Sequence, residues 1–231
     1  RLQNLQRRYD GLFELTLNKG LLLARNVVWA GGEFWHPRQP TFPGAELGIH
    51  NSRVSRWDRL PGQRAVVIGG YESGIDAAFH LIQAGKRVTV LGASAPWASK
   101  DSDPSVALAP HTMDRLQVGL ASKRLTLLKA SAKAIAVQGE GFKVLTGRRW
   151  HPSDSPPILA TGFNSSLQSI AELFHWKDEV AQVQLKDDQS TRSPGLYVAG
   201  PSLRHQHDGK LLIFCFIYKY RGRFPVVAAS I

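Results

Sequence analysis

Two short apolar runs on either side of a glycine-rich segment dominate the hydrophobic pattern in the middle of the chain. The first run, Arg64–Ile68, leads directly into the segment Gly69–Gly74. An amphipathic stretch and Gly85 follow, and then the second apolar run, Arg87–Leu91. Nearly continuous apolar runs of this length are typical of buried parallel strands. The pattern predicts a strand, a glycine turn, a helix and a second strand, which together make a βαβ unit.

The flanking pattern predicts further elements of both kinds. Apolar alternation between turn residues predicts strands over 13–17, 21–30, 125–128, 133–138, 141–146, 158–163, 180–185 and 195–200. Helical spacing predicts the end of a helix over 1–9, helices over 111–122 and 166–174, and a helical tail from 211 that bends near Gly222 and Pro225. In the second of these, Met113, Leu116 and Leu120 share one face. Loops are expected over 31–44 and 93–104, a polar extended segment over 48–60, and a crossover linker over 150–157.

The glycine turn predicts a phosphate-binding site. Backbone N–H groups and the positive end of a helix would face a pyrophosphate there. The pattern G-x-G-x-x-G places glycine at 69, 71 and 74, whereas this chain has Tyr71 at the second position. Either Gly70 shifts the close approach by one residue, or the pyrophosphate lies further out, or the glycines only tighten an ordinary crossover. The predicted binding residues are Gly69, Gly70, Tyr71, Glu72, Ser73 and Gly74.

Length and composition indicate a globular protein. With 231 residues and 43% hydrophobic content, the chain can bury one large core or two modest ones. No apolar run reaches the roughly 20 residues that cross a bilayer, and no signal peptide is visible, so we expect no membrane partner. The presence of one cysteine favours a cytoplasmic protein. The chain begins with Arg1 rather than Met, which favours a truncated or processed start. Cys215 is the only cysteine, which excludes an intrachain disulfide or a CxxC pair and suggests a small buried filler.

The net charge of +11 raises the question of a nucleic-acid partner. The basic residues are scattered, with small groups at Arg7-Arg8, Arg148-Arg149 and 219–223, and no zinc-finger or aromatic RNA-binding pattern accompanies them. A basic surface also suits cofactors that carry several phosphates. We therefore expect no nucleic-acid partner. The alternative, a basic RNA-binding protein, predicts steeply salt-dependent binding.

Three further motifs, in order along the chain, resemble the two-dinucleotide flavoprotein superfamily. The segment 26–32 with the proline loop ending at Phe42-Pro43-Gly44 looks like its first linker motif, a strand ending A-T-G. Ile158–Phe163 looks like its second A-T-G-F motif, and Leu196–Gly200 looks like the strand that leads to its flavin-contacting turn. The superfamily includes thioredoxin reductases, flavin-containing monooxygenases and pyridine nucleotide-disulfide oxidoreductases. The run Ser73–Asp76 is most similar to the monooxygenase-like members.

The resemblance implies an α/β fold in which a Rossmann-like, three-layer NAD(P)-binding domain is inserted into an incomplete FAD-binding Rossmann-like domain. The implied boundaries are 1–60 for the first FAD-binding segment, 61–150 for the NAD(P)-binding domain and 151–231 for the second FAD-binding segment. The family's first glycine-rich βαβ unit, which grips the ADP part of FAD, has no counterpart in residues 1–60. The chain therefore resembles a fragment or a degenerate copy of such a flavoprotein.

The implied cofactors are FAD and NADP. By resemblance, the flavin-side residues are Ala30, Gly31, Thr161, Gly162, Gly200, Pro201 and Ser202. The family's Gly-Asp at the flavin turn is replaced here by Gly200-Pro201, so Ser202 or backbone N–H groups would have to substitute. At the end of the second strand of the βαβ unit no carboxylate stands where an NAD-specific site would have one. Ser94 and Lys100 could contact a 2′-phosphate, which favours NADPH over NADH, although a merely solvated loop is the alternative for Lys100.

No catalytic residue and no metal site are predicted, because hydride transfer between nicotinamide and flavin is carried by the cofactors. His205, His207 and Asp208 are interpreted as a polar loop or a flavin-edge contact, and His36 as a packed or exposed loop residue. Asp76 offsets the dipole at a helix start.

The function predicted is an NAD(P)H-dependent FAD oxidoreductase acting on a small-molecule substrate. A monooxygenase-like reaction and the reduction of low-molecular-weight disulfides both stay open, as does a homodimer. The lack of a CxxC in the nicotinamide domain argues against a thioredoxin reductase. The alternative is a non-catalytic NADPH-binding module or degenerate paralogue, which Tyr71 and the missing FAD grip motivate.

Overall fold

The computed structural model describes residues 1–101, 106–177, 182–202, 204–207, 210–213 and 220–231. The chain is mixed α/β and forms two compact units. One unit combines Arg1–His36 with Asn164–Ile231 and is called the split unit; the other, Pro37–Phe163, is called the central unit. In the described part of the chain, no helix is both long enough and apolar enough to span a membrane.

A five-stranded parallel sheet forms the middle of the central unit. Its strand order is β5-β12-β6-β7-β8, and each neighbouring pair is parallel. The strands are β5 (Ile49–His50), β12 (Ile158–Leu159), β6 (Arg64–Ile68), β7 (Arg87–Leu91) and β8 (Leu125–Leu128). From β6 the chain first adds β7 and β8 on one side of the sheet and later adds β12 on the other side. The strand order therefore reverses at β6. Such a reversal marks the place where open parallel sheets bind ligands.

The helix α1 (Glu72–Gln83) covers one face of this sheet and confirms the predicted strand–turn–helix–strand order. Its buried residues Ala78 and Leu81 pack in one cluster with Val67 and Val90 of the sheet. The predicted second helix is confirmed as α2 (Pro110–Ala121). Ile75 of α1 clusters with Leu116 of α2, whereas Leu120, predicted on the same buried face, is 42% exposed.

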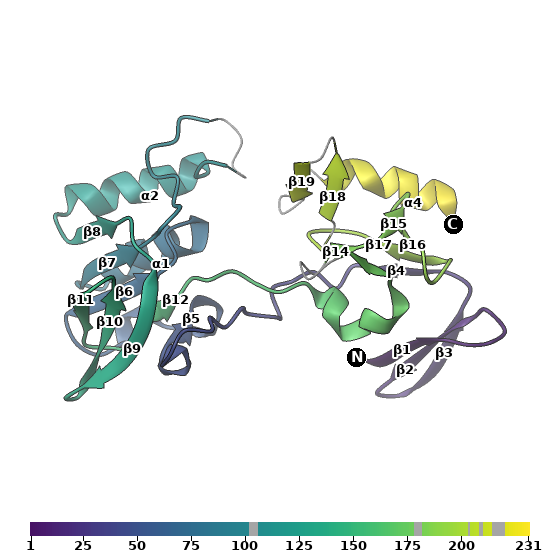
Figure 1. Cartoon of the computed structure of the whole chain (residues 1–231), viewed down its shortest axis with the longest axis horizontal. Helices are drawn as coiled ribbons and strands as arrows, with labels where there is room; N and C mark the ends of the chain where they lie inside the picture. Colours follow the sequence, from purple (N-terminus) through teal and green to yellow (C-terminus); the bar gives the residue numbers. More distant parts are fainter. Residues whose placement is uncertain (102–105, 178–181, 203, 208–209, 214–219) are drawn as a thin grey trace. The chain divides into compact units, whose positions relative to one another are not determined.

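An antiparallel meander covers the other face of the sheet (Figure 1). It consists of β9 (Ala132–Gln138), β10 (Gly141–Thr146) and β11 (Arg149–Ser153), and the predicted hairpin over Gly139-Glu140 is confirmed. The prediction of a linker over 150–157 was wrong for its first part, because β11 pairs with β10 and places Pro152 opposite Lys143. Since β11 is an edge strand, the missing N–H of Pro152 costs the sheet nothing.

Residues 48–60 do not form one extended segment. Only β5 is extended there, and two 3₁₀ turns follow, η2 (Asn51–Arg53) and η3 (Trp57–Arg59). Before β5, and directly after the proline loop, lies η1 (Ala45–Leu47). The buried Lys86 holds the next loop, because its ammonium donates to the carbonyl oxygens of Leu60, Pro61 and Gly62 at 2.6, 3.2 and 2.6 Å.

In the split unit, the N-terminal segment is a strand rather than the predicted helix end. β1 (Leu2–Arg7), β2 (Phe13–Leu17) and β3 (Gly20–Ala24) form an antiparallel sheet. Leu2 and Leu5 are three residues apart, which is also the spacing of one face of a helix. In β1 a register shift between Leu2 and Asn4 is what places both side chains on the same side of the strand. Leu5 is buried against Phe13 in the core of this unit.

A second sheet of the split unit has the order β15-β16-β17-β4. The predicted strand over 21–30 is divided into β3 and β4 (Val27–Trp29), and β4 runs parallel to β17 (Leu196–Val198). The predicted helix over 166–174 is a 3₁₀ segment, η4 (Ser166–Leu173), interrupted at Ile170. The remaining short strands of this part are β13 (Trp176–Lys177), β14 (Gln182–Val183), β15 (Leu185–Lys186) and β16 (Gln189–Ser190).

The prediction of a helix that begins at residue 211 was wrong for 211–213, which belong to a strand. β18 (Arg204–His207) pairs with β19 (Lys210–Ile213), and 214–219, which include Cys215, lie outside the described residues. Beyond them, η5 (Arg221–Arg223) leads into α4 (Phe224–Ser230). Pro225 occupies the first turn of α4, where a missing N–H has no partner to lose.

Candidate functional site

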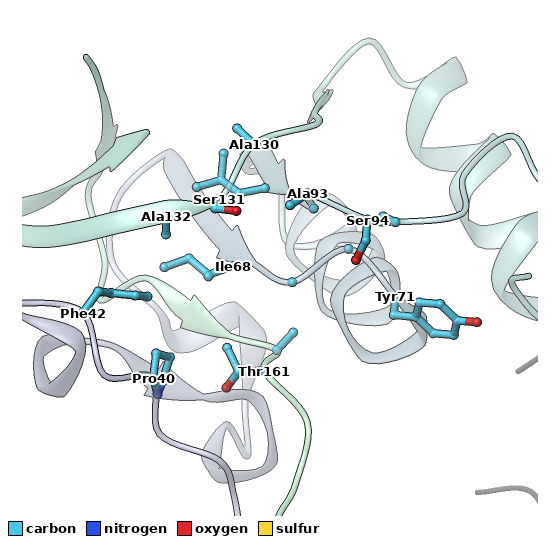
Figure 2. A pocket seen from close by; sticks show the side chains of 16 residues that line it. Pro40, Phe42, Ile68, Tyr71, Ala93, Ser94, Ala130, Ser131, Ala132 and Thr161 are labelled. Carbon is cyan, nitrogen blue, oxygen red and sulfur yellow. The ribbon is translucent and has the colours of Figure 1, made fainter. Parts of the chain in front are cut away.

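A cavity of about 350 Å³ lies at the carboxyl-terminal edge of the parallel sheet in the central unit (Figure 2). The ends of four strands contribute to it: Ile68 of β6, Leu91 of β7, Ala130 beyond β8 and Ala160 beyond β12. It therefore lies where the strand order reverses. The lining residues are Pro40, Phe42, Ile68, Gly69, Gly70, Tyr71, Leu91, Gly92, Ala93, Ser94, Ala95, Ala130, Ser131, Ala132, Ala160 and Thr161, none of which is acidic.

Two glycines of the turn are required by close backbone approach. Gly69 has φ +111°, and a Cβ there would lie 2.1 Å from the carbonyl oxygen of Ala160. A Cβ on Gly74 would lie 1.9 Å from the carbonyl oxygen of Gly69. The first glycine thus lets β6 and β12 end side by side, and the last lets α1 begin directly against the turn, which is the role that the third glycine has in dinucleotide-binding turns.

Tyr71, which replaces the second glycine, does not fill the cavity with its ring. Figure 2 shows the ring pointing away from Ile68 and Thr161, and the side chain packs with the Ile75–Leu116 cluster between α1 and α2. Tyr71 is the N-cap of α1, and its side chain makes no capping hydrogen bond. The N–H groups of Glu72 and Ser73 in the first turn have no acceptor within the helix. They are therefore available to an anion.

Gly70 serves a side chain that sequence analysis did not single out. The indole Nε1–H of Trp97 donates to the Gly70 carbonyl oxygen at 2.8 Å. A Cβ on Gly70 would lie 2.6 Å from Cζ2 of Trp97, and one on Gly92 would lie 2.8 Å from the same atom. The indole thus packs over both glycines. The space beside Gly70 belongs to Trp97 and is not open to a pyrophosphate.

Glu72 points toward α2. Its carboxylate accepts the N–H of Ala109 at 2.6 Å and the hydroxyl of Thr112. Because Ala109 is the N-cap of α2, the carboxylate caps that helix from outside and offsets its dipole. Glu72 ties α2 to the glycine turn, and its predicted contact with a cofactor stays a prediction.

The end of β7 presents small polar and apolar groups. Ala93 and Ser94 are exposed at the rim of the cavity, and Figure 2 places the Ser94 hydroxyl beside the turn after Ile68. Lys100 is exposed and is not among the lining residues. Lys129, also exposed, immediately precedes the lining residue Ala130. A 2′-phosphate would therefore meet Ser94 without facing a carboxylate from this strand.

Thr161 and Gly162 form the opposite wall. The Thr161 hydroxyl donates to the carbonyl oxygen of Arg38 at 2.6 Å, and the Gly162 carbonyl oxygen accepts the Arg38 N–H at 3.0 Å. The buried ring of His50 lies 2.9 Å through Nε2 from the same Gly162 oxygen and 2.8 Å through Nδ1 from the Ser52 hydroxyl. Burial lowers the pKa of His50. Burial thus favours the neutral ring, and its two contacts brace the Thr161–Gly162 turn.

In the split unit, the structure brings together the other residues predicted on the flavin side. β4 and β17 are parallel, so Ala30-Gly31 and Gly200-Pro201-Ser202 follow their carboxyl ends at the same edge. The buried Ser202 hydroxyl donates to the carbonyl oxygen of Gly32 at 3.0 Å, which joins the two turns. Gly200 has φ +92° and open space where a Cβ would stand.

The remaining candidates have local roles. The prediction that Asp76 offsets the dipole at a helix start was wrong, because Asp76 lies beyond the first turn of α1, whose acidic residue is Glu72. Asp76 pairs with Arg115 of α2 and lies 3.8 Å from His80. His36 donates its backbone N–H to Glu33 in a turn. His205 and His207 lie in β18, and Asp208 lies outside the described residues. Among the described residues, no three His, Cys, Asp or Glu side chains are grouped as a metal site would require.

The sequence analysis missed the lining residues Pro40, Phe42 and the small segment Ala130-Ser131-Ala132, and it also missed Trp97, which packs on the lining glycines Gly70 and Gly92. The segment Ala130-Ser131-Ala132 could have been predicted from the sequence. Ligands bind beyond the carboxyl ends of parallel strands, and 125–128 was already predicted as a strand. Trp97 had no comparable signal, because a loop tryptophan becomes informative only when its contact with Gly70 is known.

Comparisons with known proteins identify the family of the chain. Residues 2–200 match the pyridine nucleotide-disulphide oxidoreductase family, and the chain belongs to that family of enzymes. A ferredoxin–NADP reductase from Enterococcus faecalis is 23% identical over 219 residues, covering 90% of this chain and 61% of the relative. An indole-3-pyruvate monooxygenase from Oryza sativa subsp. japonica is 30% identical over 86 residues, which are 35% of this chain and 21% of that protein.

Solved structures show the same fold. A bacillithiol disulfide reductase from Staphylococcus aureus has a TM-score of 0.75 at 18% identity, covering 99% of this chain and 68% of that one. A flavin-containing monooxygenase from Stenotrophomonas maltophilia has a TM-score of 0.67 at 20% identity, covering 100% of this chain and 71% of that one. The chain spans 61% of the length of the E. faecalis reductase.

Family membership implies FAD and a nicotinamide coenzyme, and the two units fit these groups to different degrees. The central unit offers an uncapped helix start, two obligatory glycines and a cavity without acidic lining. Within the described residues of the split unit, no glycine turn joins a parallel strand to a helix. These residues fit only the edge of a flavin site.

Residues 37–60 and 151–163, assigned from the sequence to the FAD-binding segments, lie in the central compact unit because β5 and β12 join its sheet. Which cofactor each unit binds stays a prediction.

Proposed function

We propose that the central unit binds NADPH at the carboxyl-terminal edge of its sheet, as the coenzyme half of a flavin-dependent reductase. The observation that carries this is the uncapped start of α1 directly after Gly69 and Gly70, at the mouth of the cavity. When bound, the coenzyme supplies hydride and FAD accepts it.

The diphosphate is assigned to the first turn of α1. The N–H groups of Glu72 and Ser73 and the positive helix end favour an anion there, and Tyr71 packs toward α2 and leaves that approach free. Gly74 holds the helix start against Gly69. The residues that act on the coenzyme are thus mainly backbone groups, which explains why no acid–base side chain stands in the cavity.

The adenosine end is assigned to Ala93 and Ser94. No carboxylate at the end of β7 is available for the ribose hydroxyls, and the Ser94 hydroxyl can donate to a 2′-phosphate. NADP stands in the name of the E. faecalis relative, which supports the same preference. Lys100 and Lys129, exposed on neighbouring loops, add positive charge.

The substrate class is less narrowly defined. The relatives and structural neighbours include a ferredoxin–NADP reductase, a disulfide reductase and monooxygenases. The single Cys215 gives these 231 residues no cysteine pair, so disulfide exchange would need a thiol from elsewhere. We propose a small-molecule substrate reduced or oxygenated at the flavin.

Binding of the two reduced coenzymes tests the proposal. The fluorescence of NADPH and NADH is followed while the purified chain is added, with ADP-ribose as a competitor. We expect tighter binding of NADPH and displacement of both coenzymes by ADP-ribose. Equal affinities would overturn the NADPH preference, and no binding of either coenzyme would overturn the site.

A further inference from the structure

The opposite edge of the same sheet carries a second cavity, of about 550 Å³, whose chemistry is different. It opens at the amino-terminal ends of β6, β7 and β8 and is closed on one side by β11. Five cationic side chains line it, and none of the lining residues is acidic. The five are Arg64, Arg87, Lys123, Arg124 and Arg149, and the cavity that they line is here called the basic pocket.

The alternation of the strands explains how the cavity forms. The meander packs on the carboxyl-terminal half of the sheet, where Ile68, Leu91 and Val144 share a core cluster. Nearer the amino-terminal edge the same face presents Thr89 and Thr126, which line the cavity. The cavity lies between these threonines and β11, and the five cations line it.

Three of the five cations have no partner among the described residues. Arg64 is held by Asp154, with 2.6 Å between the guanidinium and the carboxylate, and Arg124 donates to the Gly85 carbonyl oxygen. For the side chains of Arg87, Lys123 and Arg149, the described part of the chain supplies no hydrogen bond or ion pair, and all three residues are exposed. Like charges gathered without counter-charges repel one another, so the arrangement is costly unless an anion is bound.

Lys123 supplies an independent indication. Its φ of +58° is left-handed, in the turn that ends α2, a position where glycine or asparagine is usual. Its N–H still bonds back to the Leu120 carbonyl oxygen at 3.1 Å. A lysine in this conformation costs backbone energy that glycine would not, and such strain is kept mainly where the side chain has a function.

We propose that the basic pocket binds a small anion carrying at least two phosphate groups. Arginine forks match phosphate oxygens, and three unpaired cations around one cavity can neutralise more than one phosphate. The cations line one cavity whose volume is in the range of small-molecule sites, which favours a small ligand over a nucleic acid.

The test is calorimetric titration of the chain with tripolyphosphate and, separately, with ATP. The variant Arg87→Ala/Lys123→Ala/Arg149→Ala should weaken both affinities about tenfold or more, because each charge-assisted contact is lost. The control Lys19→Ala/Arg25→Ala/Lys133→Ala removes the same charge from exposed sites outside the cavity and should leave both affinities within about twofold. Tighter binding of ATP than of tripolyphosphate identifies a nucleotide, and equal binding identifies a phosphate chain.

Lys123→Gly separates binding from folding. It should keep or raise the melting temperature, since glycine suits the left-handed turn, and still weaken tripolyphosphate binding. The proposal is overturned if tripolyphosphate gives no heat with the unaltered chain, if the two triple variants behave alike, or if only single-stranded RNA binds. NADPH binding should be unchanged in the first triple variant, so failure here leaves the coenzyme site untouched.

Discussion

The indole nitrogen of Trp97 donates a hydrogen bond to the carbonyl oxygen of Gly70 at 2.8 Å, and the ring covers Gly70 and Gly92 together. This contact joins the loop after β7 to the glycine turn after β6. Two walls of the cavity are thereby fixed to each other by one side chain.

Replacing Trp97 with phenylalanine should loosen that connection. The ring packing is partly kept and the donor is lost, so the free energy of unfolding should fall by about 1 kcal/mol, and NADPH should bind a few fold more weakly. Urea unfolding and coenzyme titration measure the two effects. Trp35→Phe, at a side chain that is 88% exposed, is the matched control and should change neither.

Gly69→Ala should be far more damaging than an alanine at another left-handed glycine. Its Cβ would stand 2.1 Å from the Ala160 carbonyl oxygen, so the ends of β6 and β12 must separate. We expect a loss of about 3 kcal/mol in unfolding free energy, against about 1 kcal/mol for Gly139→Ala, where φ is +60° and the space is open. Equal losses in urea unfolding would show that the close approach does not exist.

Ser94→Asp should reverse the coenzyme preference. A carboxylate at the end of β7 repels a 2′-phosphate and can bind the ribose hydroxyls of NADH instead. We expect the dissociation constant for NADPH to rise about tenfold or more while that for NADH falls or holds. Gln138→Glu adds the same charge at an exposed site on β9 and should leave the ratio of the two constants unchanged. An unchanged ratio in Ser94→Asp would place the adenosine elsewhere.

Acid should destabilise the central unit through Asp154. The Arg64 guanidinium, followed by the N–H groups of Arg64 and Gln63, lowers the pKa of Asp154 to about 2 from 3.8. A lowered carboxyl pKa gives stability that is present above pH 4 and is lost as the pH falls toward 2. Because Arg64 is more than half exposed, we expect about 1 to 2 kcal/mol.

The acid limb of urea unfolding, measured from pH 5 to pH 2, checks this loss. Asp154→Asn should be less stable at pH 5 and should show a flatter fall below pH 4. Asp58→Asn, which removes the carboxylate of the exposed pair with Arg56, should retain the slope of the unaltered chain. A slope that is the same in all three proteins would show that Asp154 does not cause the loss of stability in acid.

The βαβ core could be predicted from the sequence because its signals are local. The apolar run before Gly69, the glycines and the amphipathic stretch each specify their own conformation, and the strand–turn–helix–strand order was confirmed. The segment 1–9 failed for the opposite reason. Leu2 and Leu5 have helical spacing and share one side of β1 only because a bulge shifts the register against β2, and a bulge depends on the partner strand.

The site was predictable to a similar extent. The turn residues and Ser94 follow strand ends, so the sequence could bring them to one edge, and the structure places them there. Trp97, Phe42 and the covering meander come from segments whose contacts are made only in the folded unit. The prediction of a linker at Pro152 failed for the same reason. A proline is compatible with a strand only at a sheet edge, and the edge position of β11 is known only from the fold.

The most direct test is the amide spectrum of the ¹⁵N-labelled chain during titration with NADPH. We expect the N–H signals of Glu72 and Ser73, in the first turn of α1, to shift most and to saturate together with those of Ser94 and Thr161. Shifts confined to other residues, such as Arg87, Lys123 and Arg149 in the basic pocket, or no shift at all, would contradict the claim that this helix start holds the coenzyme's diphosphate.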